Sequence, residues 1–182
     1  PVVWTVGYLA ADHLSECLGA TRVATLTSKY CPPQVRGLSD GTIRLVNNEL
    51  YFWKAKEAGQ RDLVSLIGDY QGLTADGQYV LVEVILDLLV ELGAKEIYTL
   101  GGYGTGKMLE KPRVLGAATN RDMVKDLKTQ GVVFRKNEPG GGIVGASGWF
   151  LGLGLRPGMH AAFLMGENTG SLVGPTCAPS GA

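Results

Sequence analysis

The chain has 182 residues and a mass of 19.3 kDa, which is long enough to build one substantial hydrophobic core. Hydrophobic residues make up 45% of it and charged residues 19%, so the composition excludes a disordered or solvating chain. Its 17 basic and 17 acidic residues give a formal net charge of zero. They do not form the basic cluster that binding to nucleic acid or to an anionic membrane surface requires. We therefore predict a globular protein with neither nucleic acid nor a membrane as its partner.

The first helix and the strands that follow it are marked by caps and turn residues. Thr5 can cap a helix that stops before Gly19. The doublet Asn47-Asn48 tolerates the left-handed backbone of a two-residue turn, so it predicts a hairpin between the strands on either side. The predicted elements of this half are a helix over 5–18 and strands over 22–27, 42–46, 49–54 and 62–67.

The clearest element is a helix over residues 75–92, where Glu83, Asp87 and Glu91 recur every four positions among apolar residues. This acidic stripe is the one side that we expect to face water. Later elements are strands over 96–100, 113–117, 132–135 and 159–165 and helices over 120–130 and 143–155. Strands and helices alternate, which predicts one α/β domain over residues 1–182, with a largely parallel or mixed sheet covered by helices on both faces.

The cysteines and the apolar segments bear on location. Cys17, Cys31 and Cys177 are too few and too far apart for a disulfide framework or a metal site, and a reducing cytoplasm suits them. The most apolar run, residues 79–92, is too short and too polar to span a bilayer. The sequence opens at Pro1 without a basic and apolar leader, so we expect no signal peptide.

A glycine-rich segment from Gly101 to Lys107 follows a predicted strand with the spacing of a phosphate-binding loop. Met108 stands where that loop needs a hydroxyl group for magnesium. Pro112 interrupts the helix that should follow. A structural or surface-recognition turn is therefore favoured over nucleotide binding.

Other motifs also favour structural roles. The glycine spacing of residues 140–145 matches a dinucleotide-binding fingerprint. However, a polar segment ending in Pro139 separates these residues from the preceding strand. Ser147 lacks the second glycine of a nucleophile elbow and is expected to pack within a helix. His13 and His160 have no cysteine or acidic partner at ligand spacing. We predict no catalytic residue, no metal ion and no cofactor.

Two carboxylates, Asp69 and Glu167, come at the ends of predicted strands, where the ligands of open α/β sheets bind. A turn-stabilising role is the alternative for each. If a small molecule binds, we expect it in the crevice between these strand ends and the glycine turns. The candidate binding residues are Asp69, Gln71, Gly101, Gly102, Tyr103, Gly104, Thr105, Gly106, Gly145, Ser147 and Glu167.

A set of segments in fixed order carries a family resemblance. They are Pro32-Pro33-Gln34, Asp62 to Gln71, Gly77-Gln78-Tyr79, Glu96 to Gly106, Arg113 to Thr119, Gly142 to Gly148 and Leu164 to Glu167. Together they resemble the archaeal and actinobacterial proteins of the proteasome assembly chaperone family, in the branch called PAC2. The likeness covers residues 6–170, and no single motif carries it.

The resemblance implies a three-layer α/β/α sandwich akin to the nucleoside phosphorylase and peptidyl hydrolase type. It also implies a non-enzymatic protein that forms a homo-oligomer and binds subunits of the proteasome α-ring during assembly. Three successive aromatic residues at 51–53 favour self-association too, since a strand turns only alternate side chains inward. The alternative is a small-molecule enzyme of the phosphorylase/hydrolase type, or of the ATP-grasp type, that uses the strand-end crevice.

Both ends of the chain depart from the family pattern. Pro1 starts almost at the first helix, so we expect the family's first strand to be missing. Residues 171–182 show neither the family's final helix nor the hydrophobic-tyrosine-any tail by which some members dock onto proteasome rings. Docking through such a tail is therefore not expected here.

Overall fold

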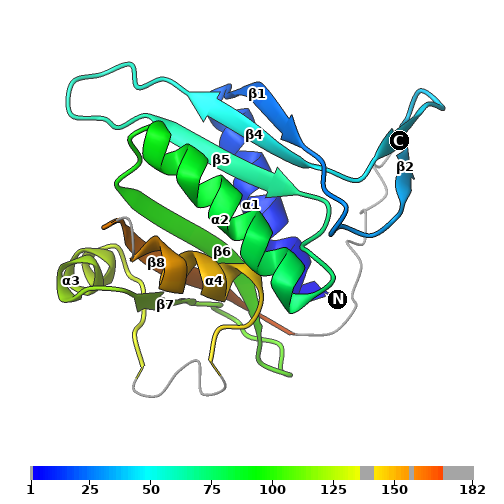
Figure 1. The fold of residues 1–182 in the computed structure, drawn as a ribbon. Coiled ribbons are helices and arrows are strands. Elements are labelled where there is room, and N and C mark those ends of the chain that lie inside the picture. Colours follow the sequence, from blue (N-terminus) through cyan, green and yellow to red (C-terminus); the bar gives the residue numbers. More distant parts are fainter. Residues whose placement is uncertain (1, 136–141, 156–157, 170–182) are drawn as a thin grey trace, which may run out of the picture.

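The computed structural model describes residues 2–135, 142–155 and 158–169 (Figure 1). The strands in these ranges form three hydrogen-bonded sheets, with the orders β1-β4-β5, β2-β3 and β6-β8-β7. In chain order the elements are α1 (Val2–Leu18), β1 (Thr21–Leu26), β2 (Val35–Gly37), β3 (Ile43–Leu45), β4 (Asn48–Trp53), β5 (Leu63–Gly68), α2 (Ala75–Glu91), β6 (Glu96–Gly104), β7 (Val114–Ala118), α3 (Arg121–Thr129), α4 (Ala146–Gly154) and β8 (His160–Asn168).

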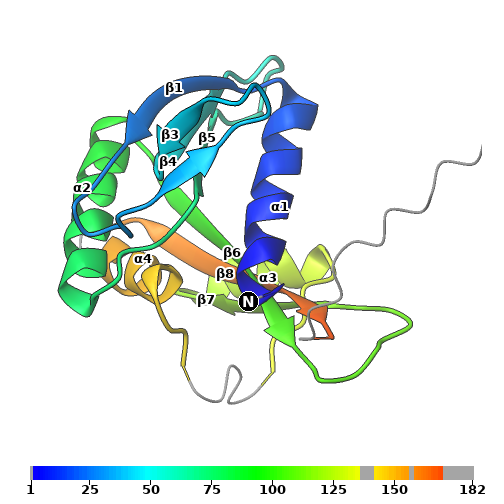
Figure 2. The same ribbon diagram turned by 90° about the vertical axis from the view of Figure 1, so that its right-hand side faces the viewer.

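Helices cover the two larger sheets from both sides. Helix α1 packs against β4 and β5 of one sheet and against β6 and β8 of the other, whereas α4 packs on β6 and β8 and is itself covered by α2. Figure 2 shows α1 on one side of these strands and α2 with α4 on the opposite side. Strands β6 and β8 are parallel and β7 is antiparallel to β8, which confirms the predicted α/β class with a mixed sheet. The described strands do not join into one central sheet, because β5 and β6 are not hydrogen-bonded to each other.

The main core lies where α2, α4, β6 and β8 meet. Its buried residues are Val82, Leu86, Ile97, Leu153, Met159 and Ala161. The rings of Tyr79 on α2 and Trp149 on α4 meet edge to face, with their centroids 5.1 Å apart. Helix α2 begins at the predicted place because the Oγ1 atom of Thr74 accepts a hydrogen bond from the backbone N–H of Gly77 at 3.1 Å.

The outer face of α2 is less polar than the sequence predicts. Asp87 and Glu91 are exposed, as expected, whereas Glu83 of the same stripe is half-buried. Val80, Val84 and Val90 are also exposed, at 40%, 53% and 46%. The prediction that only the acidic stripe faces water is therefore wrong, because the exposed arc of the helix is wider than one row of side chains. The helix presents apolar surface to its surroundings.

The predicted hairpin around Asn47-Asn48 is also wrong. Strand β3 pairs instead with β2, a strand that the sequence analysis does not predict. Strand β4 is the central strand of its sheet and pairs antiparallel with β1 on one edge and β5 on the other, so no edge remains for β3. The aromatic residues at 51–53 lie on this central strand and are half-buried, not exposed. They therefore lend little support to self-association.

Two other predicted elements are smaller than expected. Val133 forms a single parallel bridge to Leu115, where the sequence predicts a strand over 132–135. Helix α4 starts only at Ala146, after Gly145 with a φ angle of 84°. Left-handed backbone of this kind cannot belong to an α-helix, which explains why the helix does not start at residue 143.

Gly7 allows α1 to lie directly on β6, and its substitution is a test of that packing. A Cβ atom at Gly7 would lie 2.2 Å from the carbonyl oxygen of Leu100. We expect Gly7→Ala to lower the free energy of unfolding by about 1–3 kcal/mol, because the helix must move away from the strand. Gly152 in α4 is the matched control, since a Cβ atom there meets nothing within 4 Å. Gly152→Ala should stabilise by about 0.5–1 kcal/mol. Urea denaturation measures both, and effects of the same sign would contradict the close packing.

Candidate functional site

The glycine segment after Glu96 is a strand for most of its length. Residues 101–104 belong to β6 and pair in parallel with residues 165–168 of β8. A Cβ atom at Gly101 would lie 2.8 Å from the ring of Phe163, so this glycine makes room for a packed aromatic side chain. Extended and paired backbone does not curl its N–H groups around a phosphate. The predicted turn at 101–104 is therefore wrong, because glycine serves close packing here.

The true turn begins at Thr105. Its backbone N–H donates to the carbonyl oxygen of Asn168 at 2.8 Å, and the backbone N–H of Lys107 donates to the Thr105 Oγ1 atom at 3.3 Å. Gly106 adopts a φ angle of 69°, which favours glycine. These bonds tie the turn to the end of β8, and the next described element is strand β7 and not a helix. The turn therefore lacks the strand-loop-helix arrangement of a phosphate-binding loop.

Lys107 gives a direct test of this conclusion. Its side chain is exposed, so Lys107→Ala should change the free energy of unfolding by less than about 0.5 kcal/mol. We expect calorimetric titration with Mg-ATP to give no binding heat with either the parent chain or the variant. Binding heat with the parent, together with a binding free energy about 1.5–3 kcal/mol less favourable in the variant, would show that the lysine holds a phosphate.

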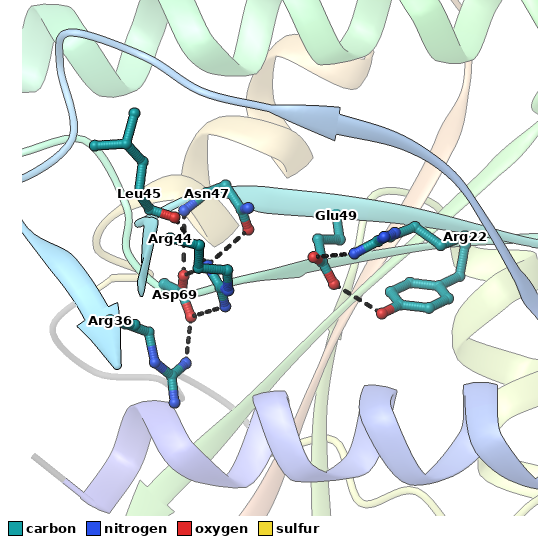
Figure 3. A network of polar contacts seen from close by, with 8 residues as sticks. Arg22, Arg36, Arg44, Leu45, Asn47, Glu49 and Asp69 are labelled. Atoms are coloured by element: carbon teal, nitrogen blue, oxygen red, sulfur yellow. Dashed lines mark hydrogen bonds and ion pairs between the residues drawn. The ribbon is translucent and has the colours of Figure 1, made fainter. Parts of the chain in front are cut away.

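Asp69, just after β5, is a buried carboxylate held by two arginines (Figure 3). Its side chain is 3% exposed. Arg44 on β3 donates from Nη1 to Oδ2 at 2.5 Å and from Nη2 to Oδ1 at 3.1 Å. Arg36 on β2 donates to Oδ1, and the backbone N–H of Asn47 donates to Oδ2 at 3.1 Å. Each carboxylate oxygen thus accepts two hydrogen bonds.

This arrangement gives Asp69 a structural role. Burial raises the pKa of its carboxyl group, but the hydrogen bonds from Arg44, Arg36 and Asn47 together outweigh burial and hold the pKa below its usual value. A carboxylate has about four lone-pair sites, and all of them are used. Asp69 therefore fixes the β2-β3 hairpin to the end of β5, and its oxygens are not available to a substrate.

Glu167 near the end of β8 is held in a similar way. Its side chain is 2% exposed. Arg113 donates to it from Nη2 at 2.6 Å, from Nε at 2.9 Å and from its backbone N–H at 3.0 Å. The Nη2 atom of Arg135 lies 3.7 Å from Oε1. The hydrogen bond from the Arg113 side chain lowers the pKa of the carboxyl group, and burial opposes it without cancelling it. Glu167 thus ties the start of β7 to β8.

Gln71 meets Gly145 and serves as the cap of α4. Its Oε1 atom accepts a hydrogen bond from the backbone N–H of Ala146 at 3.1 Å. A Cβ atom at Gly145 would lie 2.7 Å from the same oxygen, so glycine leaves room for this contact. Ser147 lies in the first turn of the helix and is half-buried, in agreement with the packing role expected of it. Of the candidate residues, Gln71 and Gly145 are brought together across the longest stretch of sequence.

The predicted crevice therefore divides into three clusters with separate roles. Asp69 holds the hairpin, Gln71 caps α4, and the glycines of β6 lie beside Glu167, which is opposite Tyr103 in the ladder. Two surface hollows of about 360 Å³ each lie elsewhere, and none of the candidate residues lines either of them. The sequence analysis missed the arginines that neutralise the two carboxylates. One argument could have pointed to these arginines: a carboxylate that is buried in a folded chain requires a cation or several hydrogen-bond donors beside it.

One pair was also missed on α1. The Sγ atom of Cys17 lies 3.5 Å from Nε2 of His13, one helical turn earlier, so the prediction that His13 lacks a cysteine partner is wrong. Within the described ranges, no group of three or more His, Cys, Asp and Glu side chains is placed to hold a metal ion. Cys177 lies outside those ranges. None of the described helices combines the length and the apolar character needed to cross a membrane.

Comparison with known proteins decides the family. The model of the PAC2 family matches residues 5–180. The chain belongs to the PAC2 family. An uncharacterized protein of Methanocaldococcus jannaschii is 38% identical over 178 residues, which is 98% of this chain and 67% of that relative.

Two solved structures from Pyrococcus furiosus are similar over nearly the whole chain. PbaB, described as an archaeal proteasome activator, is 37% identical with a TM-score of 0.87, over 95% of this chain and 74% of PbaB. PbaA, described as an archaeal homolog of proteasome-assembly chaperone, is 26% identical with a TM-score of 0.74, over 94% of this chain and 66% of PbaA. The resemblance seen in the sequence is thus confirmed. The chain is a PAC2 protein of the proteasome assembly chaperone-like kind.

Proposed function

We propose that this PAC2 protein binds proteasome α subunits and further copies of itself, and thereby assists assembly of the proteasome ring. The observation that carries the proposal is the similarity to PbaB over 95% of this chain, with a TM-score of 0.87. Exposed apolar side chains on the β2-β3 hairpin and on α2 support it, since a binding protein needs such surface. We also propose a cytoplasmic location, which the cysteines favour.

The buried carboxylates weaken the enzyme alternative. The enzyme alternative relies on Asp69 and Glu167 as the acid or base groups that reach substrate at the strand ends. Asp69 uses both oxygens on the β2-β3 hairpin, and Glu167 uses both on Arg113. A binding protein needs no such group, so the same ion pairs are compatible with the proposed function.

We further propose that residues 1–182 form a single PAC2 domain with the three-layer sandwich that the resemblance implies. Among the described strands, β5 pairs only with β4 and β6 pairs only with β8, while α1 packs against both β5 and β6. A strand between β5 and β6 would join the two sheets beneath α1 into the middle layer of a three-layer sandwich. The expected loss of the family's final helix and docking tail concerns residues 171–182, which lie outside the described ranges.

An assembly experiment tests the proposed function. Purified archaeal proteasome α and β subunits are mixed with the chain, or with an unrelated protein of similar size as control, and native gels follow the products over time. We expect ring species to form faster with the chain, and the chain to migrate with α subunits but not with β subunits alone. Unchanged kinetics together with no comigration would contradict the proposal.

A further inference from the structure

A hollow of about 360 Å³ lies between the end of α1 and strand β4. Its lining residues are Asp12, Ser15, Glu16, Gly19, Ala20 and Tyr51. Asp12, Ser15 and Glu16 are spaced at i, i+3 and i+4, so they share the face of α1 that borders the hollow. None of the six lining residues is basic, and neither Asp12 nor Glu16 forms an ion pair with a residue that the structure describes. Two carboxylates therefore border the hollow without a cation to balance them.

Ser15 adds a buried polar atom that lacks a partner. The residue is 4% exposed, and its Oγ atom has no hydrogen-bond partner among the described residues. Buried hydroxyl groups normally have a partner, because the loss of their bonds to water is costly. Ser15 lies between the two carboxylates along α1, and rotation about a single side-chain bond changes the direction of its Oγ atom. An N–H donor in the hollow would supply the hydrogen bond that the chain itself does not.

Tyr51 presents a further acceptor from β4. Its hydroxyl group donates to Oε2 of Glu49 at 2.7 Å, so its proton is in use and its lone pairs remain. This hydrogen bond and burial raise the pKa of Tyr51 to about 12, with a further contribution from the charge of Asp12, whose carboxylate therefore lies near the hydroxyl group. Arg22 is paired with Glu49 at 2.9 Å and does not line the hollow (Figure 3).

The end of α1 adds negative potential at the same place. The C-terminal end of a helix carries a partial negative charge that cations stabilise, and the last turn of α1 contains no basic residue. The backbone N–H groups of Gly19 and Ala20 donate to the carbonyl oxygens of Glu16 and Ser15, so they are not available to an anion. The hollow thus offers hydrogen-bond acceptors and negative charge, which suit a cation that carries several N–H donors.

We propose that this hollow binds a linear aliphatic diamine, with one ammonium group on Asp12 and the other on Glu16. Residues four apart on a helix have Cβ atoms about 5–6 Å apart. The two nitrogen atoms of 1,4-diaminobutane have a comparable separation, so one molecule bridges both carboxylates. Each ammonium group carries three donors, and the Ser15 Oγ and Tyr51 Oη atoms accept those that the carboxylates leave.

Size and donor number favour an organic cation over a metal ion. Sites for small molecules have volumes of about 300–1,000 Å³, and this hollow lies within that range. Calcium takes about six to eight oxygen ligands, but no three His, Cys, Asp or Glu side chains of the described chain are placed to hold a metal ion. Ala20 and the ring of Tyr51 provide apolar surface for the methylene groups of a diamine. This inference does not depend on the binding of α subunits.

Isothermal titration calorimetry with 1,4-diaminobutane tests the inference. We expect saturable binding to the parent chain, with a dissociation constant that Asp12→Asn and Glu16→Gln each raise about tenfold or more, since each removes a charged contact. Asp87→Asn is the matched control, because it removes the same charge from the exposed face of α2 and should leave the constant unchanged. Ser15→Ala should weaken binding about threefold, yet raise the unfolding midpoint without ligand, because it removes a buried hydroxyl group that has no partner.

Two further probes define the class of ligand. We expect 1-aminobutane, which has one ammonium group like a lysine side chain, to bind about tenfold more weakly than the diamine. Magnesium chloride at the same concentration should not compete. Unfolding midpoints like that of the parent show that the Asn and Gln variants are folded.

Four results would overturn the inference. They are no saturable binding at millimolar diamine, equal binding by Asp12→Asn, Glu16→Gln and Asp87→Asn, equal affinity for 1-aminobutane, and competition by magnesium. Equal affinity for 1-aminobutane would assign the hollow to a single ammonium group such as that of a lysine. Competition by magnesium would assign it to a metal ion.

Discussion

Replacement of Leu86 by alanine is expected to lower the free energy of unfolding by about 2–5 kcal/mol. Leu86 is 3% exposed and lies in the core cluster with Ile97 of β6 and Leu153 of α4. Truncation removes buried methyl groups and leaves a cavity where α2, α4 and β6 meet, and close-packed neighbours fill such a cavity only in part. The loss should appear as a lower midpoint in urea denaturation.

Val84 on the same helix is the matched control for Leu86. Its side chain is 53% exposed, so Val84→Ala should change the free energy of unfolding by no more than about 0.5 kcal/mol. Both variants place alanine, the best helix former, at the substituted position, so neither loses helix propensity. If Leu86→Ala leaves the midpoint where Val84→Ala leaves it, the inner face of α2 is not packed as described.

Asp69→Asn is expected to lower the free energy of unfolding by about 3 kcal/mol at neutral pH, because it removes the charge that balances two arginines. This value is at the low end of the cost of removing one partner from a buried ion pair, because the side chains of Arg36 and Arg44 are 51% and 28% exposed. Backbone amides of residues 35–45 should also exchange their hydrogens faster, because the hairpin loses its attachment to β5. Hydrogen exchange that is unchanged across this segment would show that Asp69 does not hold the hairpin.

The effect of Asp69 should depend on pH in one direction. Its pKa in the folded chain lies below the unfolded value of about 3.9, so the ionised group stabilises the fold. That contribution is complete above the unfolded pKa and is lost as pH falls through the folded pKa. The difference in stability between the parent and Asp69→Asn should therefore shrink below about pH 4. Asp87→Asn, on the exposed face of α2, should have little effect at any pH, and an equal pH response in both variants would contradict this explanation.

Helices α2 and α3 could be predicted from sequence because their signals are local, whereas Thr5, the expected cap of the first helix, lies inside α1. Asn120 precedes α3 and accepts a hydrogen bond from the backbone N–H of Met123 at 2.8 Å, as a capping residue should. The apolar pattern of α2 likewise gave its bounds to within one residue. Strand pairing depends on distant segments, so the local signal at Asn47-Asn48 predicted a hairpin that the sheet does not form. The glycines of β6 were ambiguous in the same way, because glycine suits both a turn and a close contact.

The positions of the candidate carboxylates in the fold could be predicted, but the residues that bind them could not. Asp69 and Glu167 do lie at the ends of their strands, as the order of elements suggested. Their partners depend on register and on packing: Arg36 lies 33 residues from Asp69, and Arg113 lies 54 residues from Glu167. No local pattern connects such pairs. The structure therefore favours the stabilising role that the sequence had left open beside ligand binding.

The central claim, that this PAC2 protein acts by binding proteasome α subunits, is tested most directly by sedimentation velocity. Fluorescently labelled chain is mixed with increasing amounts of an archaeal proteasome α subunit. In a separate experiment, unfolding of the chain alone is measured with Mg-ATP and with nucleosides. The claim predicts a faster-sedimenting labelled species that saturates with α subunit, and no stabilisation by either small molecule. A sedimentation coefficient that stays constant, together with stabilisation of about 2.7 kcal/mol at a nucleotide concentration of about 100 times its dissociation constant, would contradict it.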